Sequence, residues 1–204
     1  MNLHLPQTEE ARAEAFHLMG VTNNIITPKN GESLIKPIQD FITASYLLSS
    51  KDRFFDRGQF TLLCSYFCNA DVDIDIPPPT IFKPVELWTG KQVFGVLLRP
   101  TKEETNFINL ETDSKGYKSN LKEKDPQDTY VVFTNSQLMC GVLDKKVLGV
   151  GKNCLYHLLY RDYGSKVCAQ KMGALAKLCA RFLGNFGFSI GIEDVKIFYF
   201  LYTF

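Results

Sequence analysis

The order of apolar and polar positions along the chain predicts mainly helices. Thr8 can cap a helix with acidic residues in its first turn, because a helix N-terminus favours negative charge. A largely apolar stretch from Pro37 to Leu48 predicts a buried helix, and proline suits its first turn. The apolar spacing also predicts helices over residues 56–68 and over a stretch that Thr89 caps and Pro100 ends.

The most regular pattern lies between Ser165 and Leu183. Apolar side chains recur there at intervals of three and four residues, which is the spacing of one face of a helix. Lys166, Lys177 and Arg181 fall on the opposite face. This segment therefore predicts an amphipathic helix that packs one face against a core.

Other segments predict strands and loops. Asp71–Ile76 alternates acidic and apolar residues before three prolines, which predicts an edge strand with its charged face in water. Residues 130–134 and 137–143 are strand-like, and Asn135-Ser136 between them predicts a hairpin. Residues 101–129 hold twelve charged side chains and predict a long polar loop. Helices with a small hairpin or sheet region give an α+β fold class.

The composition is that of an ordinary folded domain. The 204 residues are 45% hydrophobic and 22% charged, which excludes a disordered chain, a collagen-like repeat and a coiled-coil rod. Six cysteines are too few for a disulfide scaffold and predict reduced thiols. No apolar run reaches the roughly 18 residues that a membrane-spanning helix needs, so we expect no membrane partner.

A net charge of +1 hides a basic stretch. Residues 145–181 carry eight lysines and arginines against a single acidic residue, Asp162. Such a stretch is typical of a surface that faces a polyanion, and equally of a solvated helix face. The charge pattern alone leaves both interpretations open. Asp144-Lys145-Lys146, at the start of the stretch, predicts an exposed turn.

Metal-binding patterns are incomplete. Asp71, Asp73 and Asp75 have the hard oxygen ligands that Mg²⁺ prefers, but the segment lacks the glycine of a tight metal loop, so we expect the edge strand. Cys64 with Cys68, and Cys154 with His157, lack the paired turns of a structural zinc site. We expect no zinc and buried thiols instead. Without a nucleophile–base pair or a phosphate-binding glycine loop, the residues predict no complete active site.

Several segments resemble, in order, the largest subunit of multisubunit DNA-directed RNA polymerases. Residues 1–15 resemble the stretch that follows that family's Asn-Ala-Asp-Phe-Asp-Gly-Asp metal loop. Other matching motifs are Pro77-Pro78-Pro79-Thr80-Ile81, Trp88-Thr89-Gly90-Lys91-Gln92 and Gly187-Phe188-Ser189-Ile190-Gly191. The sequence resembles the RNA polymerase III branch of the family most closely.

The resemblance implies a division of the chain. Residues 1–20 would complete the active-site domain, residues 21–194 would form the pore domain, and residues 195–204 would be an aromatic tail outside the family. The implied activity is nucleotidyl transfer from nucleoside triphosphates to an RNA transcript on a DNA template, in the nucleus. The implied partners are the other polymerase subunits. The family's Mg²⁺ would be held upstream of Met1, so we expect this chain alone to be inactive.

The resemblance also implies candidate binding residues. Lys145 and Lys146 match a paired lysine of the family's pore, which would attract triphosphates or a backtracked RNA end. The alternative is a pair of solvated turn lysines. Lys91 is a further candidate, although its motif can serve packing alone. A different hypothesis for the whole chain is a non-catalytic, truncated product that binds polymerase subunits or nucleic acid.

Overall fold

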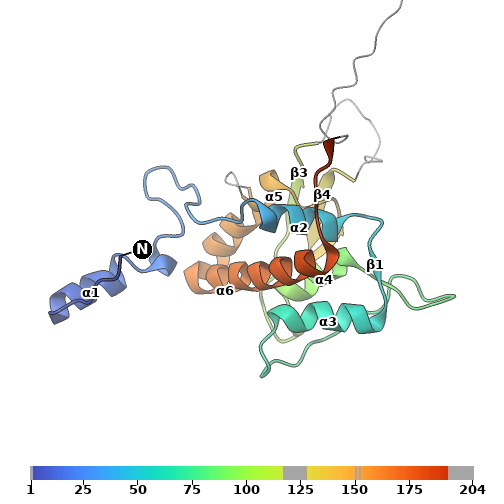
Figure 1. Cartoon of the computed structure of the whole chain (residues 1–204), viewed down its shortest axis with the longest axis horizontal. Coiled ribbons are helices and arrows are strands. Elements are labelled where there is room, and N and C mark those ends of the chain that lie inside the picture. The colour runs from blue at the N-terminus through green and yellow to red at the C-terminus, as the bar shows by residue number, and fades with distance from the viewer. Residues whose placement is uncertain (1, 117–127, 150, 152, 193–204) are drawn as a thin grey trace, which may run out of the picture.

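The computed structural model describes residues 2–116, 128–149, 151 and 153–192 and has an α+β fold (Figure 1). Two small antiparallel sheets accompany the helices. Its helices are α1 (Glu9–His17), the short 3₁₀ helix η1 (Val21–Asn23), α2 (Asp40–Ser49), α3 (Arg57–Phe67), α4 (Gly90–Leu98), α5 (Lys145–Leu148) and α6 (Leu155–Phe186). Its strands are β1 (Phe54–Phe55), β2 (Trp88–Thr89), β3 (Leu110–Asp113), β4 (Tyr130–Thr134) and β5 (Gln137–Cys140). The predicted fold class is confirmed.

Helix α4 lies at the centre of the hydrophobic core. It contacts α2, α3, α6 and β5, and most of its residues are buried. The predicted cap is present: the Thr89 N–H donates to the Gln92 side-chain oxygen at 3.0 Å. Gly90 is needed for the close approach to α2, because a Cβ there would lie 1.8 Å from the Leu48 carbonyl oxygen.

The predicted amphipathic helix is confirmed as part of a longer one. Helix α6 begins at Leu155, and Gly164 interrupts it with a left-handed backbone (φ 85°), so it consists of two helical pieces. In the second piece Cys168, Cys179 and Phe182 are buried, as the periodicity predicts. The sequence did not predict the first piece, from Leu155 to Gly164. It is short, and its apolar residues are interrupted by Arg161 and Asp162.

The three-stranded sheet has the order β3-β4-β5. The predicted hairpin is confirmed, with Asn135 and Ser136 at positive φ (51° and 66°) in its turn. The prediction of a long polar loop over residues 101–129 is wrong in part. Strand β3 lies within this segment and pairs with β4 through Leu110 and its neighbours. Within β3 only Leu110 is apolar, so no alternating pattern marks this strand in the sequence. Residues 117–127 lie outside the described residues.

Three further predictions need correction. Asp71–Ile76 forms no strand: the Asp75 N–H donates to the Pro100 carbonyl (2.9 Å), and the prolines that follow lack the N–H groups of a strand ladder. Helix α2 starts at Asp40 rather than at Pro37, because Gln39 has a left-handed backbone (φ 48°). Lys145 and Lys146 are exposed as predicted, but with Asp144 they form a helix cap and first helical turn rather than a simple turn.

Helix α1 extends away from the rest of the molecule (Figure 1). Its predicted cap is confirmed, because the Thr8 side chain accepts a hydrogen bond from the Ala11 N–H at 3.2 Å. None of its residues is buried, and Phe16 is 74% exposed. The predicted tail at residues 195–204 lies outside the described residues.

The contact between α2 and α4 predicts a sharp difference between two glycine substitutions. Gly90→Ala forces a Cβ against the Leu48 carbonyl, and we expect it to lower the free energy of unfolding by about 3 kcal/mol or more. Gly173→Ala, in α6 with no neighbouring atom within 4 Å of the new Cβ, is the control. It should raise stability by about 0.5 to 1 kcal/mol. Urea unfolding of the two variants measures both effects, and equal stabilities would contradict this account of the core.

Candidate functional site

The lysine pair, Lys145 and Lys146, is exposed on the first turn of α5. The Asp144 carboxylate caps this turn, accepting hydrogen bonds from the Lys146 N–H (2.9 Å) and the Val147 N–H (3.0 Å). Val147 and Leu148 are buried, so they anchor α5 in the core. The backbone of the lysine pair is therefore fixed, while both side chains extend into solvent. Within the described residues, neither ammonium forms an ion pair.

Lys91, the third candidate, has a different environment. It forms an ion pair with Asp128, and its side chain is only 12% exposed. Its ammonium also donates to the Gly141 carbonyl at 2.9 Å, and the Gly141 N–H donates to the Asp128 carboxylate at 2.7 Å. Lys91 thus links α4 to the residue that follows β5. This geometry favours the packing interpretation of Lys91.

The Lys91 link bears indirectly on the lysine pair. Gly141 is followed by Val142 and Leu143, both buried, and then by Asp144. The Leu143 N–H donates to the buried Ser49 hydroxyl at 2.9 Å, which ties the same segment to α2. The chain leading into α5 is therefore held on both sides before it presents the lysine pair.

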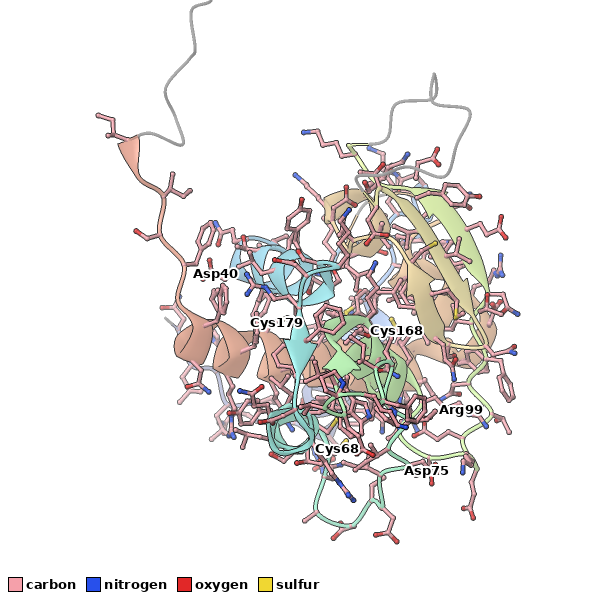
Figure 2. The ribbon with its side chains drawn as sticks, turned by 90° about the vertical axis from the view of Figure 1, so that its right-hand side faces the viewer. Asp40, Cys68, Asp75, Arg99, Cys168 and Cys179 are labelled. Carbon is pink, nitrogen blue, oxygen red and sulfur yellow. The ribbon has the colours of Figure 1, made fainter. Side chains whose placement is uncertain are left out.

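A cleft of about 580 Å³ lies between the Asp75–Pro78 segment, α4 and β5. Figure 2 shows Asp75 and Arg99 on the same side of the molecule. The Asp75 carboxylate accepts from the Lys102 N–H at 2.7 Å, and the Arg99 guanidinium donates to the Glu104 carbonyl at 2.9 Å. Both charges are thus engaged by neighbouring backbone groups. The cleft has no assembled set of groups for acid–base or nucleophilic chemistry among its described residues.

The described residues contain no group of three or more His, Cys, Asp or Glu side chains that could hold a metal ion. Asp75, one of the three alternating aspartates, is engaged with the Lys102 backbone. In the same described part of the chain, no helix is long and apolar enough to cross a membrane.

The cysteines all carry free thiols. Figure 2 shows Cys168 and Cys179 in the interior of the molecule, and Cys64 is also buried. Burial raises the pKa of Cys64 and Cys168 to about 12 and that of Cys179 to about 11. A thiol is a nucleophile or metal ligand only when it is deprotonated, so these groups are inert at neutral pH.

Comparison with known proteins identifies the family. The family described as RNA polymerase Rpb1, domain 3, matches residues 24–195. The chain belongs to the Rpb1 domain 3 family. This match includes Lys91, Lys145 and Lys146, so all three candidate residues lie within Rpb1 domain 3.

Several close relatives are RNA polymerase III subunits. The chain is 59% identical over 197 residues to the DNA-directed RNA polymerase III subunit rpc1 of Dictyostelium discoideum. It is 52% identical over 201 residues to subunit RPC1 of Saccharomyces cerevisiae and 50% identical over 199 residues to RPC1 of Homo sapiens. Each alignment covers 96% of this chain, which spans about 14% of the length of these curated relatives. The resemblance to the polymerase III largest subunit is confirmed.

The link between Lys91 and Asp128 in this Rpb1 domain predicts a coupled effect on stability. Lys91→Met leaves the Asp128 carboxylate, which is 15% exposed, without its partner and should cost about 3 kcal/mol of unfolding free energy. Asp128→Asn in addition should recover part of that loss. Urea unfolding of the single and double variants forms the cycle, with the exposed Lys166→Met as control. Strictly additive effects would mean that the pair carries no coupling.

The buried thiols predict a pH-dependent contribution to stability. Below pH 9 the thiols are protonated in both folded and unfolded chains, so their contribution is fully present. Between pH 9, where Cys64 ordinarily ionises, and its folded pKa of about 12, the contribution is lost as pH rises. At pH 8 we expect a thiol reagent to label Cys64, Cys168 and Cys179 only after unfolding, and the half-buried Cys140 in the native chain. Rapid labelling of all four in the native chain would contradict the buried assignment.

Proposed function

We propose that this chain is part of the catalytic largest subunit of RNA polymerase III and lines the channel through which nucleotides reach the active site. Its identity with RPC1 relatives across 96% of its length is the observation that carries the proposal. In this proposal residues 1–20 belong to the active-site domain and residues 21–194 to the pore domain, followed by a tail over residues 195–204. The enzyme would act in the nucleus, with the other subunits, template DNA, RNA transcript and nucleoside triphosphates as partners.

The lysine pair supplies the chemistry in this proposal. A lysine ammonium is a compact, hydrated charge that attracts phosphates without reading a base. Lys145 and Lys146 are exposed, and neither forms an ion pair within the described residues. Their positive charge can raise the local concentration of triphosphates or hold a displaced RNA end.

The proposal assigns nucleotidyl transfer to the assembled enzyme. Mg²⁺ in that reaction would stabilise the attacking hydroxyl and the leaving pyrophosphate. The described residues do not fit a magnesium site, because they bring no three metal-ligating side chains together. The resemblance of residues 1–15 to the stretch that follows the family's metal loop supports the proposal that the metal is held by residues upstream of Met1 and that the chain alone is inactive.

A second candidate function is binding without catalysis, to polymerase subunits or nucleic acid. The exposed apolar residues in and after α1 favour it: Phe16 is 74% exposed and Met19 is 76% exposed. Exposed apolar residues that lie close together are typical of protein–protein contacts. This candidate requires that the chain associates with polymerase subunits while nucleotide use stays unchanged.

Reversing the charge of the lysine pair tests the channel role. In polymerase III assembled with Lys145→Glu and Lys146→Glu, we expect the KM for nucleoside triphosphates to rise by about 5-fold at low salt. The effect should shrink as salt screens the charges. Lys29→Glu combined with Lys83→Glu, at two exposed lysines on other loops, is the charge-matched control. If the pair variant changes neither this KM at any salt concentration nor the crosslinking of a displaced RNA 3′ end to this chain, the channel role is refuted and the binding-only alternative is favoured.

A further inference from the structure

The Asp144 carboxylate joins two segments that lie far apart in the sequence. One oxygen accepts the two N–H groups of the first turn of α5, from Lys146 and Val147. The other oxygen accepts the Lys115 N–H at 2.5 Å. Lys115 follows β3, and β3 contacts α5, as Figure 1 also shows. A single side chain thus brings a third lysine beside the lysine pair.

The chain that leads into Lys115 is held by the sheet. The preceding residue, Ser114, is buried, and its N–H donates to the Thr129 carbonyl at 2.8 Å. Before that, Asp113 pairs with Tyr130 at the end of the β3–β4 ladder. The Lys115 side chain itself is exposed. The position of Lys115 is therefore set by the sheet on one side and by Asp144 on the other.

The charge of Asp144 does not cancel the lysines through direct ion pairs. Both of its oxygens are occupied by backbone N–H groups. Within the described residues, none of the ammonium groups of Lys115, Lys145 and Lys146 lies within ion-pair distance of a carboxylate. Neighbouring ammonium groups repel one another, so a ligand that carries several linked negative charges relieves more repulsion than a single carboxylate does.

We propose that Lys115 acts with Lys145 and Lys146 as one phosphate-binding lysine group, and that Asp144 is its positioning residue. This inference rests on the proposed function and extends it to a residue outside the lysine pair. The ligand chemistry is a chain of phosphates, supplied either by a nucleoside triphosphate or by the backbone of an RNA end. Lysine contacts to phosphate carry no base specificity, so the group should treat all four nucleotides alike.

Asp144→Asn separates the two roles of the carboxylate. An asparagine is a good helix cap, so its oxygen can still accept the N–H groups of Lys146 and Val147. Its amide nitrogen is a donor and cannot accept the Lys115 N–H. This variant should therefore preserve α5 and release Lys115. Asp144→Ala removes both roles and serves as the comparison for loss of the cap.

The test uses polymerase III assembled with this chain in its largest subunit. The first arm measures the KM for nucleoside triphosphates, and the second measures photocrosslinking of a displaced RNA 3′ end to this chain. At low salt, Lys115→Glu should either raise this KM or lower the crosslinking yield by about 2- to 5-fold. A change in the KM identifies the nucleoside triphosphate as the source of the phosphates, and a change in crosslinking identifies the RNA end. In the Asp144→Asn background the same substitution should have no further effect. Lys83→Glu alone is the control.

The outcomes separate this inference from the proposed function. If reversing Lys145 and Lys146 alters either arm but Lys115→Glu alters neither, the three-lysine group is refuted and the channel role stands. If neither set of variants has an effect, both proposals fail. If Lys115→Glu has its full effect in the Asp144→Asn background, Asp144 does not position Lys115. The positioning role would also be refuted if Asp144→Asn behaved like the unchanged enzyme in both arms while Asp144→Ala did not. The helix cap alone would then suffice.

Discussion

Helix α4 has to pack against α2, α3, α6 and β5 at the same time, and this requirement governs the rest of the structure. A glycine makes the packing possible: Gly90 admits the Leu48 carbonyl, which a Cβ there would approach to 1.8 Å. The same helix carries Lys91, which reaches Gly141 at the end of the sheet. One element therefore builds the core and also fixes the segment that leads to the exposed lysines.

The basic stretch over residues 145–181 divides into two kinds of charge. Some of its charges already have partners. Lys171 pairs with Glu104 at 2.9 Å, and Arg161 pairs with Asp162. The hydrogen bond from Arg161 lowers the pKa of the Asp162 carboxyl. Arg181 lies over the Tyr66 ring at 5.3 Å. Neither original interpretation, a single polyanion-facing surface or a solvated helix face, describes the whole stretch. The lysines of α5 differ from these engaged residues because their ammonium groups extend into solvent, as do those of the exposed Lys166 and Lys177 on α6.

Local chemistry was readable from the sequence, and long-range contacts were not. Thr8 and Thr89 begin helices because a cap depends on residues three or four positions away. The strand predicted from the alternation at Asp71–Ile76 does not form, because a strand also needs a partner strand. This segment instead forms hydrogen bonds with the loop after α4. The Lys115–Asp144 bond spans 29 residues and has no sequence signal. The lysine pair was found through family resemblance, whereas Lys115 could be found only in the folded chain.

The structure also constrains how strongly the lysine group can bind. Its backbone is fixed by Asp144 and by the β3–β4 ladder, but each lysine side chain retains about 2 kcal/mol of rotamer entropy that binding must overcome. Point charges in water gain little from a single contact, so several weak contacts would be made and broken quickly. In the role that we propose, such a group would concentrate phosphates without trapping them. The proposed channel would require that property, since a nucleotide held tightly at its wall would not reach the active site.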